Sequence, residues 1–368
     1  MKHPSSYLDW YVHVQKVKYD LKSSGITHLP YRLDLGDVDL SVNYAHGNPE
    51  TTKVLAKRYE VNPENIFISS EGASGQNARI IRFLAEKNPK KNEAIVEFPT
   101  YEPLLRQVQE HFPVLKRLER KENADYALDA DILKKIVSDK TGLLVLTNPH
   151  APSGAVSGNG ELIEIMEVAR ERGVFVVCDE IYAEFERKAV PTIFSVDSEY
   201  GIVTTSYTKA YGLGGLKVGT AVANESLVDG LYEDVLNTVG NSPNVVQMAT
   251  TKLFTDGRVQ LEKHQHKWVA LKKHVEKRFN EVGIEYFPNE ISITYWIKLC
   301  VKDTHKWINS CAVPRFDVAP VPGAFFLFQK DYEIVKSNLI RLGLGAMDPD
   351  KPEFFDQALS ALQQAVSG

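Results

Sequence analysis

TTSYTKAYGLGGLKVG, residues 204–219, joins a β-branched run to a lysine and then to a glycine-rich loop. Lys209 follows the apolar strand expected at 202–205, and the hydroxyl residues Ser206 and Thr208 stand next to it. A lysine at a strand end, held among hydroxyls and glycines, is placed to form a Schiff base with a carbonyl compound. The glycines allow the backbone to come close to a ligand.

Two simpler interpretations of this stretch stay open when it is taken alone. Lys209 could be an ordinary solvated lysine in front of a flexible loop, since lysines are mostly exposed. Gly212-x-Gly214 could be a phosphate-binding turn of a nucleotide site, but that turn opens a helix. Residues 218–223 read as a strand, which disfavours the nucleotide interpretation.

Size and composition are those of an ordinary globular chain. Its 368 residues favour two domains. Hydrophobic residues make up 43% and charged residues 25%, and the net charge of -5 gives no reason to expect nucleic acid or an anionic membrane as a partner. No apolar run approaches the ~20 residues that span a bilayer.

The cysteines and the N-terminus favour a cytoplasmic protein. Cys178, Cys300 and Cys311 are few, odd in number and far apart, which indicates a reducing compartment without a disulfide framework. Residues 1–4 lack the apolar core of a signal peptide. No metal site is predicted.

Apolar strands alternate with helices through the first two thirds of the chain. Strands are expected at 94–98, 142–147 and 174–178, and an amphipathic helix at 161–172. Such alternation predicts an α/β fold with a mostly parallel sheet flanked by helices. Ligands of these sheets bind beyond the C-terminal strand ends, and the noteworthy residues all follow expected strands. They are Ser74, Tyr101, Asn148, Asp179 and Lys209.

The remaining sequence predicts a smaller α+β domain built from both chain ends. A long helical stretch at 246–280 separates it from the first part. The predicted large domain is 46–280, and the small domain combines 1–45 with 281–368. Its expected elements are a helix at 8–21, a short strand at 32–37, strands at 295–299, 324–328 and 338–342, and a final helix at 352–366.

The polar residues at the strand ends suit one particular cofactor. Asp179 could pair with a heteroaromatic N–H and keep a pyridine ring protonated, while Tyr182 could reach the adjacent ring oxygen and Tyr101 could stack on the ring. A glycine-turn phosphate site and the imine-forming Lys209 complete what pyridoxal phosphate requires. The phosphate residues would be Gly72, Ala73, Ser74, Ser206 and Lys217.

Each residue alone also has a simpler interpretation. Asp179-Glu180 could cap a helix, Asn148-Pro149 could be only a turn, and Arg341 could belong to a surface ion pair. The turn at 72–75 could cap a helix without binding a ligand. The ordered set is harder to explain by chance than any member.

From about 33 to 366 the sequence resembles the pyridoxal-phosphate-dependent aminotransferases of fold type I, in the class I/II group. Three segments carry the resemblance: 206–219, Cys178-Asp179-Glu180-Ile181-Tyr182, and 148–154. The resemblance implies that Lys209 is the Schiff-base lysine and proton shuttle. It implies that Asp179 binds the ring nitrogen and Tyr182 the ring oxygen.

The resemblance also implies the remaining contacts and the assembly. Arg341, with the Gly36 backbone, would bind the substrate α-carboxylate. Tyr44 would reach the phosphate of a neighbouring subunit, which implies a homodimer with shared sites. The implied cofactor-binding residues are Gly72, Ala73, Ser74, Tyr101, Asn148, Asp179, Tyr182, Ser206, Thr208, Lys209, Lys217 and Tyr44.

Two positions depart from the family pattern. Lys217 stands where the family usually has arginine, so a bidentate phosphate contact becomes a point charge. Ala151 stands where an asparagine usually bonds the ring oxygen. The expected function is transfer of an α-amino group from an amino acid to a 2-oxo acid, in enzyme class EC 2.6.1. Alternatives are a lyase or decarboxylase on the same scaffold, a histidinol-phosphate aminotransferase, or a non-catalytic cofactor-binding regulator.

Overall fold

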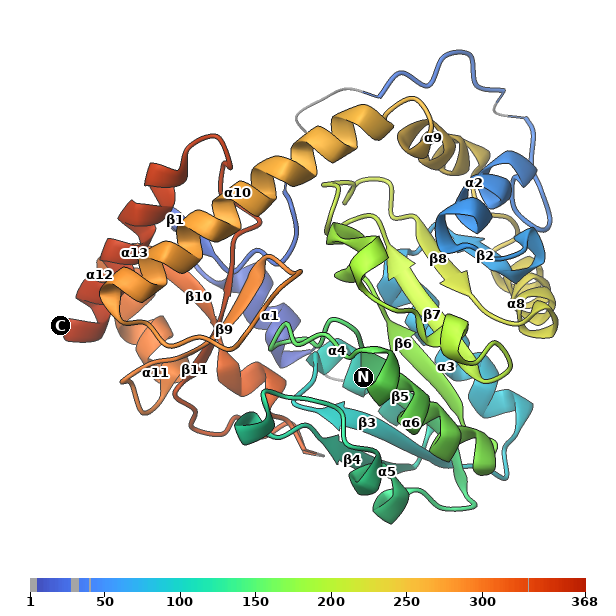
Figure 1. The fold of residues 1–368 in the computed structure, drawn as a ribbon, viewed down its shortest axis with the longest axis horizontal. Coiled ribbons are helices and arrows are strands. Elements are labelled where there is room, and N and C mark those ends of the chain that lie inside the picture. Colours follow the sequence, from blue (N-terminus) through green and yellow to red (C-terminus); the bar gives the residue numbers. More distant parts are fainter. Residues whose placement is uncertain (1–4, 28–32, 40, 330) are drawn as a thin grey trace.

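The computed structural model describes residues 5–27, 33–39, 41–329 and 331–368. Two sheets organise this part of the chain (Figure 1). A seven-stranded sheet lies among the residues before the long helix α10 (Arg258–Val282), and a four-stranded sheet combines strands from both ends of the chain. The α/β architecture predicted from the sequence is confirmed.

The large sheet is mostly parallel. Four successive neighbour pairs, from β4 through β3, β5 and β6 to β7, are parallel, and β8 runs antiparallel to both of its neighbours. In spatial order the strands are β2 (Ile66–Ser69), β8 (Gly219–Val222), β7 (Gly201–Ser206), β6 (Phe175–Asp179), β5 (Thr141–Thr147), β3 (Glu93–Phe98) and β4 (Val114–Glu119).

Both faces of this sheet are covered, which explains why its strands are apolar at successive positions. In β6, Val176 and Cys178 pack into the core that includes α6, whereas Val177 packs into the core that includes α3. Figure 1 shows α6 in front of the sheet and α3 behind it. The helices before α10 are α1 (Ser6–His13), α2 (Pro49–Tyr59), α3 (Gly72–Lys87), α4 (Glu102–His111), α5 (Ala130–Ile136), α6 (Asn159–Glu171), α7 (Ile193–Val196), α8 (Glu225–Thr238) and α9 (Asn244–Phe254).

The small sheet joins the two ends of the chain. β1 (Tyr19–Leu21) pairs in parallel with β10 (Val318–Pro322), which pairs antiparallel with β11 (Leu339–Gly343), and β9 (Thr294–Lys298) forms the far edge. Figure 1 shows α10 running from α9, beside the large sheet, to the small sheet. The remaining helices are α11 (Thr304–Trp307), α12 (Val313–Phe316) and α13 (Pro352–Ser367).

Three predictions about local structure are wrong. The helix expected at 8–21 ends at His13, because the chain then extends to pair β1 with β10. Residues 324–328 form no strand, because the first three belong to the 3-10 helix Gly323–Phe326 and the last two are irregular; the strand of this region is β10. Of the strand expected at 32–37, Arg32 lies outside the described residues and the rest is irregular, with Gly36 at a φ of 61°.

Two further observations bear on earlier predictions. Within the described ranges, no helix is both long and apolar enough to cross a membrane. The expected domain boundaries near residues 45 and 280 stay a prediction, although the small sheet combines β1 from the N-terminal part with three strands that follow α10.

Candidate active site

The register of the parallel strands brings three chain segments together at one edge of the large sheet. Thr147 lies opposite Asp179, which lies opposite Thr204. Beyond these residues, the Asn148 N–H donates to the Asp179 carbonyl, and the Glu180 N–H donates to the Thr204 carbonyl. The C-terminal ends of β5, β6 and β7 therefore meet where the sequence predicted a shared site.

Lys209 follows β7 and turns its amine toward the N-terminal segment. Its Nζ donates a hydrogen bond to the Ser24 hydroxyl at 2.8 Å. Burial lowers the pKa of Lys209, and the nearby Arg341 and Lys217 charges lower it further, against the opposing effects of Tyr7 and Asp179. Within the described residues Lys209 forms no ion pair. A larger share of its amine is therefore neutral and nucleophilic than for an exposed lysine.

Asp179 is held by hydrogen bonds and not by a cation. Asn77 of α3 donates to Oδ2 at 2.7 Å, and the Ile181 N–H donates to Oδ1 at 3.1 Å. Asn77 in turn accepts from Thr204 Oγ1 at 2.5 Å, which fixes the orientation of its amide. Burial raises the pKa of Asp179, while Asn77, Ile181 and Lys209 oppose the rise. In the described part of the chain no arginine or lysine pairs with this carboxylate.

Arg341, in β11, is a buried guanidinium without a carboxylate partner among the described residues. Its side chain is 3% exposed, and Nη2 donates to the Tyr7 hydroxyl at 3.1 Å and to the Lys22 carbonyl at 2.8 Å. The Nε atom is buried and has no hydrogen-bond partner. The Tyr7 and Phe326 rings lie 5.6 and 5.3 Å from the guanidinium carbon. A buried cation with an unused donor is suited to bind an anion.

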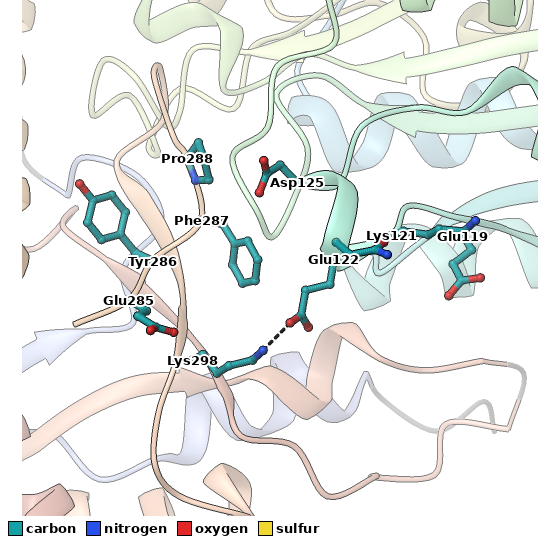
Figure 2. A pocket seen from close by; sticks show the side chains of 10 residues that line it. Glu119, Lys121, Glu122, Asp125, Glu285, Tyr286, Phe287, Pro288 and Lys298 are labelled. Carbon is teal, nitrogen blue, oxygen red and sulfur yellow. Dashed lines mark hydrogen bonds and ion pairs between the residues drawn. The ribbon is translucent and has the colours of Figure 1, made fainter. Parts of the chain in front are cut away.

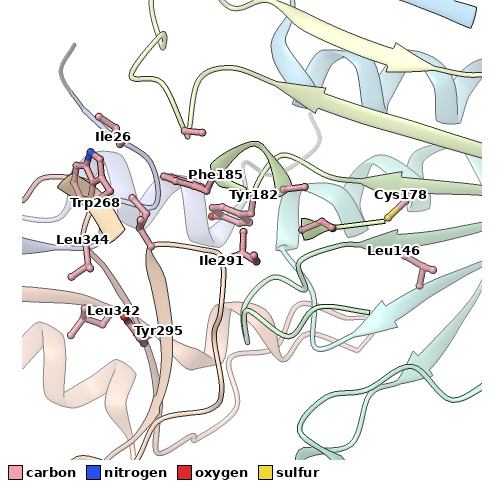
Figure 3. Packing of buried hydrophobic residues seen from close by; sticks show 14 of the residues in the cluster. Ile26, Leu146, Cys178, Tyr182, Phe185, Trp268, Ile291, Tyr295, Leu342 and Leu344 are labelled. Atoms are coloured by element: carbon pink, nitrogen blue, oxygen red, sulfur yellow. The ribbon is translucent and has the colours of Figure 1, made fainter. Parts of the chain in front are cut away.

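Three tyrosines surround these charges. Tyr7 of α1 packs edge-on against Tyr101, with ring centroids 5.4 Å apart. Burial raises the pKa of Tyr101 well above its usual value, and Tyr7 and Tyr182 add to the rise. Figure 3 shows Tyr182 beside Phe185 and Ile291 at the boundary of the two sheets. The rings give the charged groups a largely apolar surrounding, which strengthens electrostatic interactions there.

A second part of the site lies at the N-terminus of α3. The Gly72 N–H donates to the Lys217 carbonyl at 2.6 Å. A Cβ added to Gly72 would lie 3.9 Å from both Ser206 Oγ and Lys217 Cδ, so these three residues border one small space. Ala73 and Ser74 form the first turn, where N–H groups lack intrahelical partners and favour anions. Thr208 bonds Ser206 Oγ through its backbone N–H at 3.3 Å.

Three predicted residues make no described side-chain contact with this cluster. The Asn148 side chain bonds the backbone of Ser157 through both its oxygen, at 2.9 Å, and its nitrogen, at 3.1 Å. These bonds close the 148–157 loop, and the expected cofactor contact of Asn148 stays a prediction. Gly36 is part of an exposed turn capped by Asp34 at 2.9 Å, and Tyr44 is half-buried ahead of α2. The roles of Gly36 and Tyr44 stay predictions.

Sequence reasoning missed Asn77, Tyr7 and Ser24. Asn77 had a signal, because its spacing of three from Ser74 and four from Ala73 places it on the same face of a helix. Tyr7 and Ser24 had none, because their neighbours come from β11 and from the lysine loop, far away in the sequence.

At least one surface pocket lies away from this cluster. This pocket of about 580 Å³ is bordered by residues 119–125 and 285–288, and Figure 2 shows Lys298 reaching Glu122 across it. None of its lining residues belongs to the cluster around Lys209.

Known proteins of similar sequence are aminotransferases. The histidinol-phosphate aminotransferase of Methanocaldococcus jannaschii is 27% identical over 183 residues, which are 50% of this chain and 48% of that protein. Histidinol-phosphate aminotransferase 2 of Carboxydothermus hydrogenoformans is 28% identical over 239 residues, covering 64% of this chain and 63% of that protein. The chain thus matches about half to two thirds of the length of these relatives.

Solved structures share the whole fold at low identity. A PLP-dependent aminotransferase from Streptococcus suis has a TM-score of 0.82 at 21% identity, covering 100% of this chain and 98% of that one. Thermus thermophilus aspartate aminotransferase with maleate has a TM-score of 0.80 at 18% identity, covering 99% and 97%. The family model described as aminotransferase class I and II matches residues 33–353. Taken with the fold, this match shows that the chain belongs to the class I and II aminotransferase family.

Proposed function

We propose that this protein is an aminotransferase that moves an α-amino group from an amino acid to a 2-oxo acid. The observation that carries the proposal is a group of three charges without ionic partners among the described residues: the buried Arg341 and the partly buried Lys209 and Asp179. Buried charges are normally paired inside the protein, so an unpaired set of both signs fits a ligand of complementary charge.

Pyridoxal phosphate fits the residues present and is the cofactor we propose. Asp179 would bind a cationic ring N–H, and the α3 N-terminus with Ser206 and Lys217 would bind a phosphate. Tyr101 and Tyr182 would border the ring. When bound, this cofactor supplies a carbonyl group for an amine and a ring that accepts electrons.

Lys209, Arg341 and the aromatic rings around them would have separate roles in the reaction. Lys209, with its lowered pKa, supplies a neutral amine that can bond to a carbonyl carbon or take up a proton from the substrate Cα. Arg341 holds the substrate carboxylate with Nε and its other free donors, and Tyr7 keeps the guanidinium in place. The packed rings of Tyr7, Tyr101 and Phe326 exclude water from that carboxylate.

A half-reaction assay tests the function. The purified protein is loaded with pyridoxal phosphate and mixed with single amino acids without any 2-oxo acid. An aminotransferase releases the matching 2-oxo acid once and leaves the cofactor in its amine form, which chromatography of the extracted cofactor detects. Release of carbon dioxide, or repeated turnover to pyruvate without an acceptor, would instead identify a decarboxylase or a lyase.

We also propose a cytoplasmic homodimer with shared sites. Support for the compartment comes from the cysteines, since Cys178, Cys300 and Cys311 are all free. Support for the dimer comes only from the family pattern around Tyr44. Light scattering of the purified protein gives the mass, and mixing Lys209→Ala with Tyr44→Phe protomers tests sharing, because mixed dimers would regain one complete site.

A further inference from the structure

The segment Ser23–Thr27 is fixed between the small sheet and the lysine loop. The Gly345 N–H donates to the Ser23 carbonyl at 2.9 Å, and the Thr27 N–H donates to the Gly345 carbonyl at 3.1 Å. On the other side, the Ile26 N–H donates to the Lys209 carbonyl at 2.8 Å. The segment is therefore bonded both to the chain after β11 and to the backbone of the reactive lysine.

Close approach to Lys209 requires a glycine in this segment. A Cβ added to Gly25 would lie 2.5 Å from Lys209 Cδ and 2.8 Å from Lys209 Cα, too close for real atoms. Gly25 thus lets the backbone contact the aliphatic part of the Lys209 side chain. This contact places the preceding residue, Ser24, beside the Lys209 amine.

Ser24 is the sole hydrogen-bond partner of the Lys209 amine among the described residues. Its hydroxyl lies 2.8 Å from Nζ, and the serine is only 6% exposed. Asp179 acts on Lys209 electrostatically but directs its oxygens to Asn77 and Ile181. The amine thus has one directional contact, made by a residue fixed on both sides.

We propose that Ser24 is a positioning residue of the transfer reaction, whose hydroxyl holds the Lys209 amine at the site whenever that amine is not bonded to a carbonyl carbon. The proposal rests on the proposed function, because an amine that is released and reused must stay close to the substrate. A flexible lysine stem alone gives no such restraint, since it loses much rotamer freedom on being fixed.

The first test uses the protein without cofactor. Wild type, Ser24→Ala and Ser23→Ala are treated with a limiting amount of an acetylating ester, and mass spectrometry of peptides gives the labelling rate of Lys209 relative to exposed Lys277. Ser23→Ala is the matched control, because Ser23 is also buried but directs its hydroxyl to Asp20 at 3.4 Å. We expect Lys209 to react about fivefold faster in Ser24→Ala alone, as for loss of one hydrogen bond of about 1 kcal/mol.

The second test uses the loaded enzyme. We expect Ser24→Ala to lower kcat at least about tenfold with KM changed less than about twofold, because the substrate still finds Arg341 while the amine is misplaced. Ser24→Thr, which keeps the hydroxyl, should restore most of kcat.

Either of two results overturns the proposal: equal Lys209 labelling in Ser24→Ala and Ser23→Ala, or equal kcat values in those two variants. A wild type that transfers no amino group would refute the proposed function instead. The labelling comparison would then still decide whether Ser24 restrains the amine.

Discussion

The residues around Lys209 and the residues around Glu184 differ in whether their charges are paired within the protein. Glu184 is fully buried, and its carboxylate accepts from Arg58 Nη2 at 2.5 Å and from the Tyr59 hydroxyl at 2.5 Å. Burial alone would raise the pKa of Glu184, but Arg58 and Arg187 hold it below its usual value. Asp179 is only partly buried and has no such cation among the described residues, and burial raises its pKa.

We infer from this difference that the group around Glu184 stabilises the fold, whereas the group around Lys209 is suited to bind a ligand. Glu184 joins α2, through Arg58 and Tyr59, to the turn after β6, so its charge is compensated within the protein. Lys209, Asp179 and Arg341 are left with neutral hydrogen-bond partners. Substitutions in the two groups should therefore affect different properties, activity in one and stability in the other.

The largest effect is expected for Lys209→Ala. Because Lys209 is the amine proposed to bond to the carbonyl carbon, we expect transfer to fall by about ten-thousandfold or more, ~5.5 kcal/mol of barrier. The thermal midpoint of the cofactor-free protein should stay within a few degrees of wild type, since no ion pair is lost. Turnover within tenfold of wild type would show that another group performs the chemistry.

Asp179→Asn should follow, with a loss of about a thousandfold in kcat, ~4 kcal/mol. The amide lacks the negative charge that would keep a bound ring cationic, while its size is almost unchanged. Steady-state kinetics with saturating cofactor measure the loss. A change below about tenfold would mean that Asp179 serves the protein only as a hydrogen-bond acceptor for Asn77.

Glu184→Gln tests the other side of the comparison. We expect the free energy of unfolding to fall by about 3 kcal/mol, because Arg58 keeps its charge and loses its carboxylate. Urea titration of the cofactor-free protein measures this, and kcat per folded molecule should be unchanged. Unchanged stability together with lost activity would reverse the assignment of the two groups.

The pH dependence of the same pair of proteins gives a control. The pKa of Glu184 is lower in the folded protein than its ordinary value of 4.5. Such a carboxylate stabilises the folded state fully above pH 4.5, and this stabilisation is lost as the pH falls through the pKa of the folded state. The stability difference between wild type and Glu184→Gln should therefore narrow below about pH 4.5.

The smallest effect is expected for Tyr7→Phe. The ring contact with Tyr101 is kept, but Arg341 loses one hydrogen bond. We expect KM for the amino acid to rise about fivefold, ~1 kcal/mol, with kcat changed less than twofold. Tyr11→Phe, a variant of a half-buried tyrosine also on α1, is the control. An equal rise of KM in Tyr11→Phe would attribute the effect to the packing of α1 instead.

The strands β3, β5, β6 and β7 could be predicted because each is mostly apolar and is followed by a recognisable polar or aromatic residue. The strand β4 could not be predicted, because it lies at the edge of the sheet and combines polar residues such as Lys116 and Arg117 with few apolar residues. β1 has only three residues and owes its strand conformation to pairing with β10.

The site was predictable to the extent that its residues lie within local motifs. Lys209, Asp179 and the glycine turn at Gly72 have such motifs. Ser24 and Tyr7 depend on tertiary contacts with residues 185 and 334 positions away. The bonds of the Asn148 side chain to Ser157 could not be predicted, because a strand-end amide can bind either a ligand or the backbone of its own loop.

The pairing of β1 with β10 has a consequence for how the protein is made. Residues 19–21 are synthesised early, but their partner strand is Val318–Pro322. The Ser23 carbonyl likewise accepts its hydrogen bond from Gly345, which is synthesised late. Contacts of such sequence separation form late in folding, because a long loop must close first. A nascent chain can thus assemble its large sheet on the ribosome while the amine of Lys209 still lacks Ser24. The protein would gain its working lysine only near the completion of the chain.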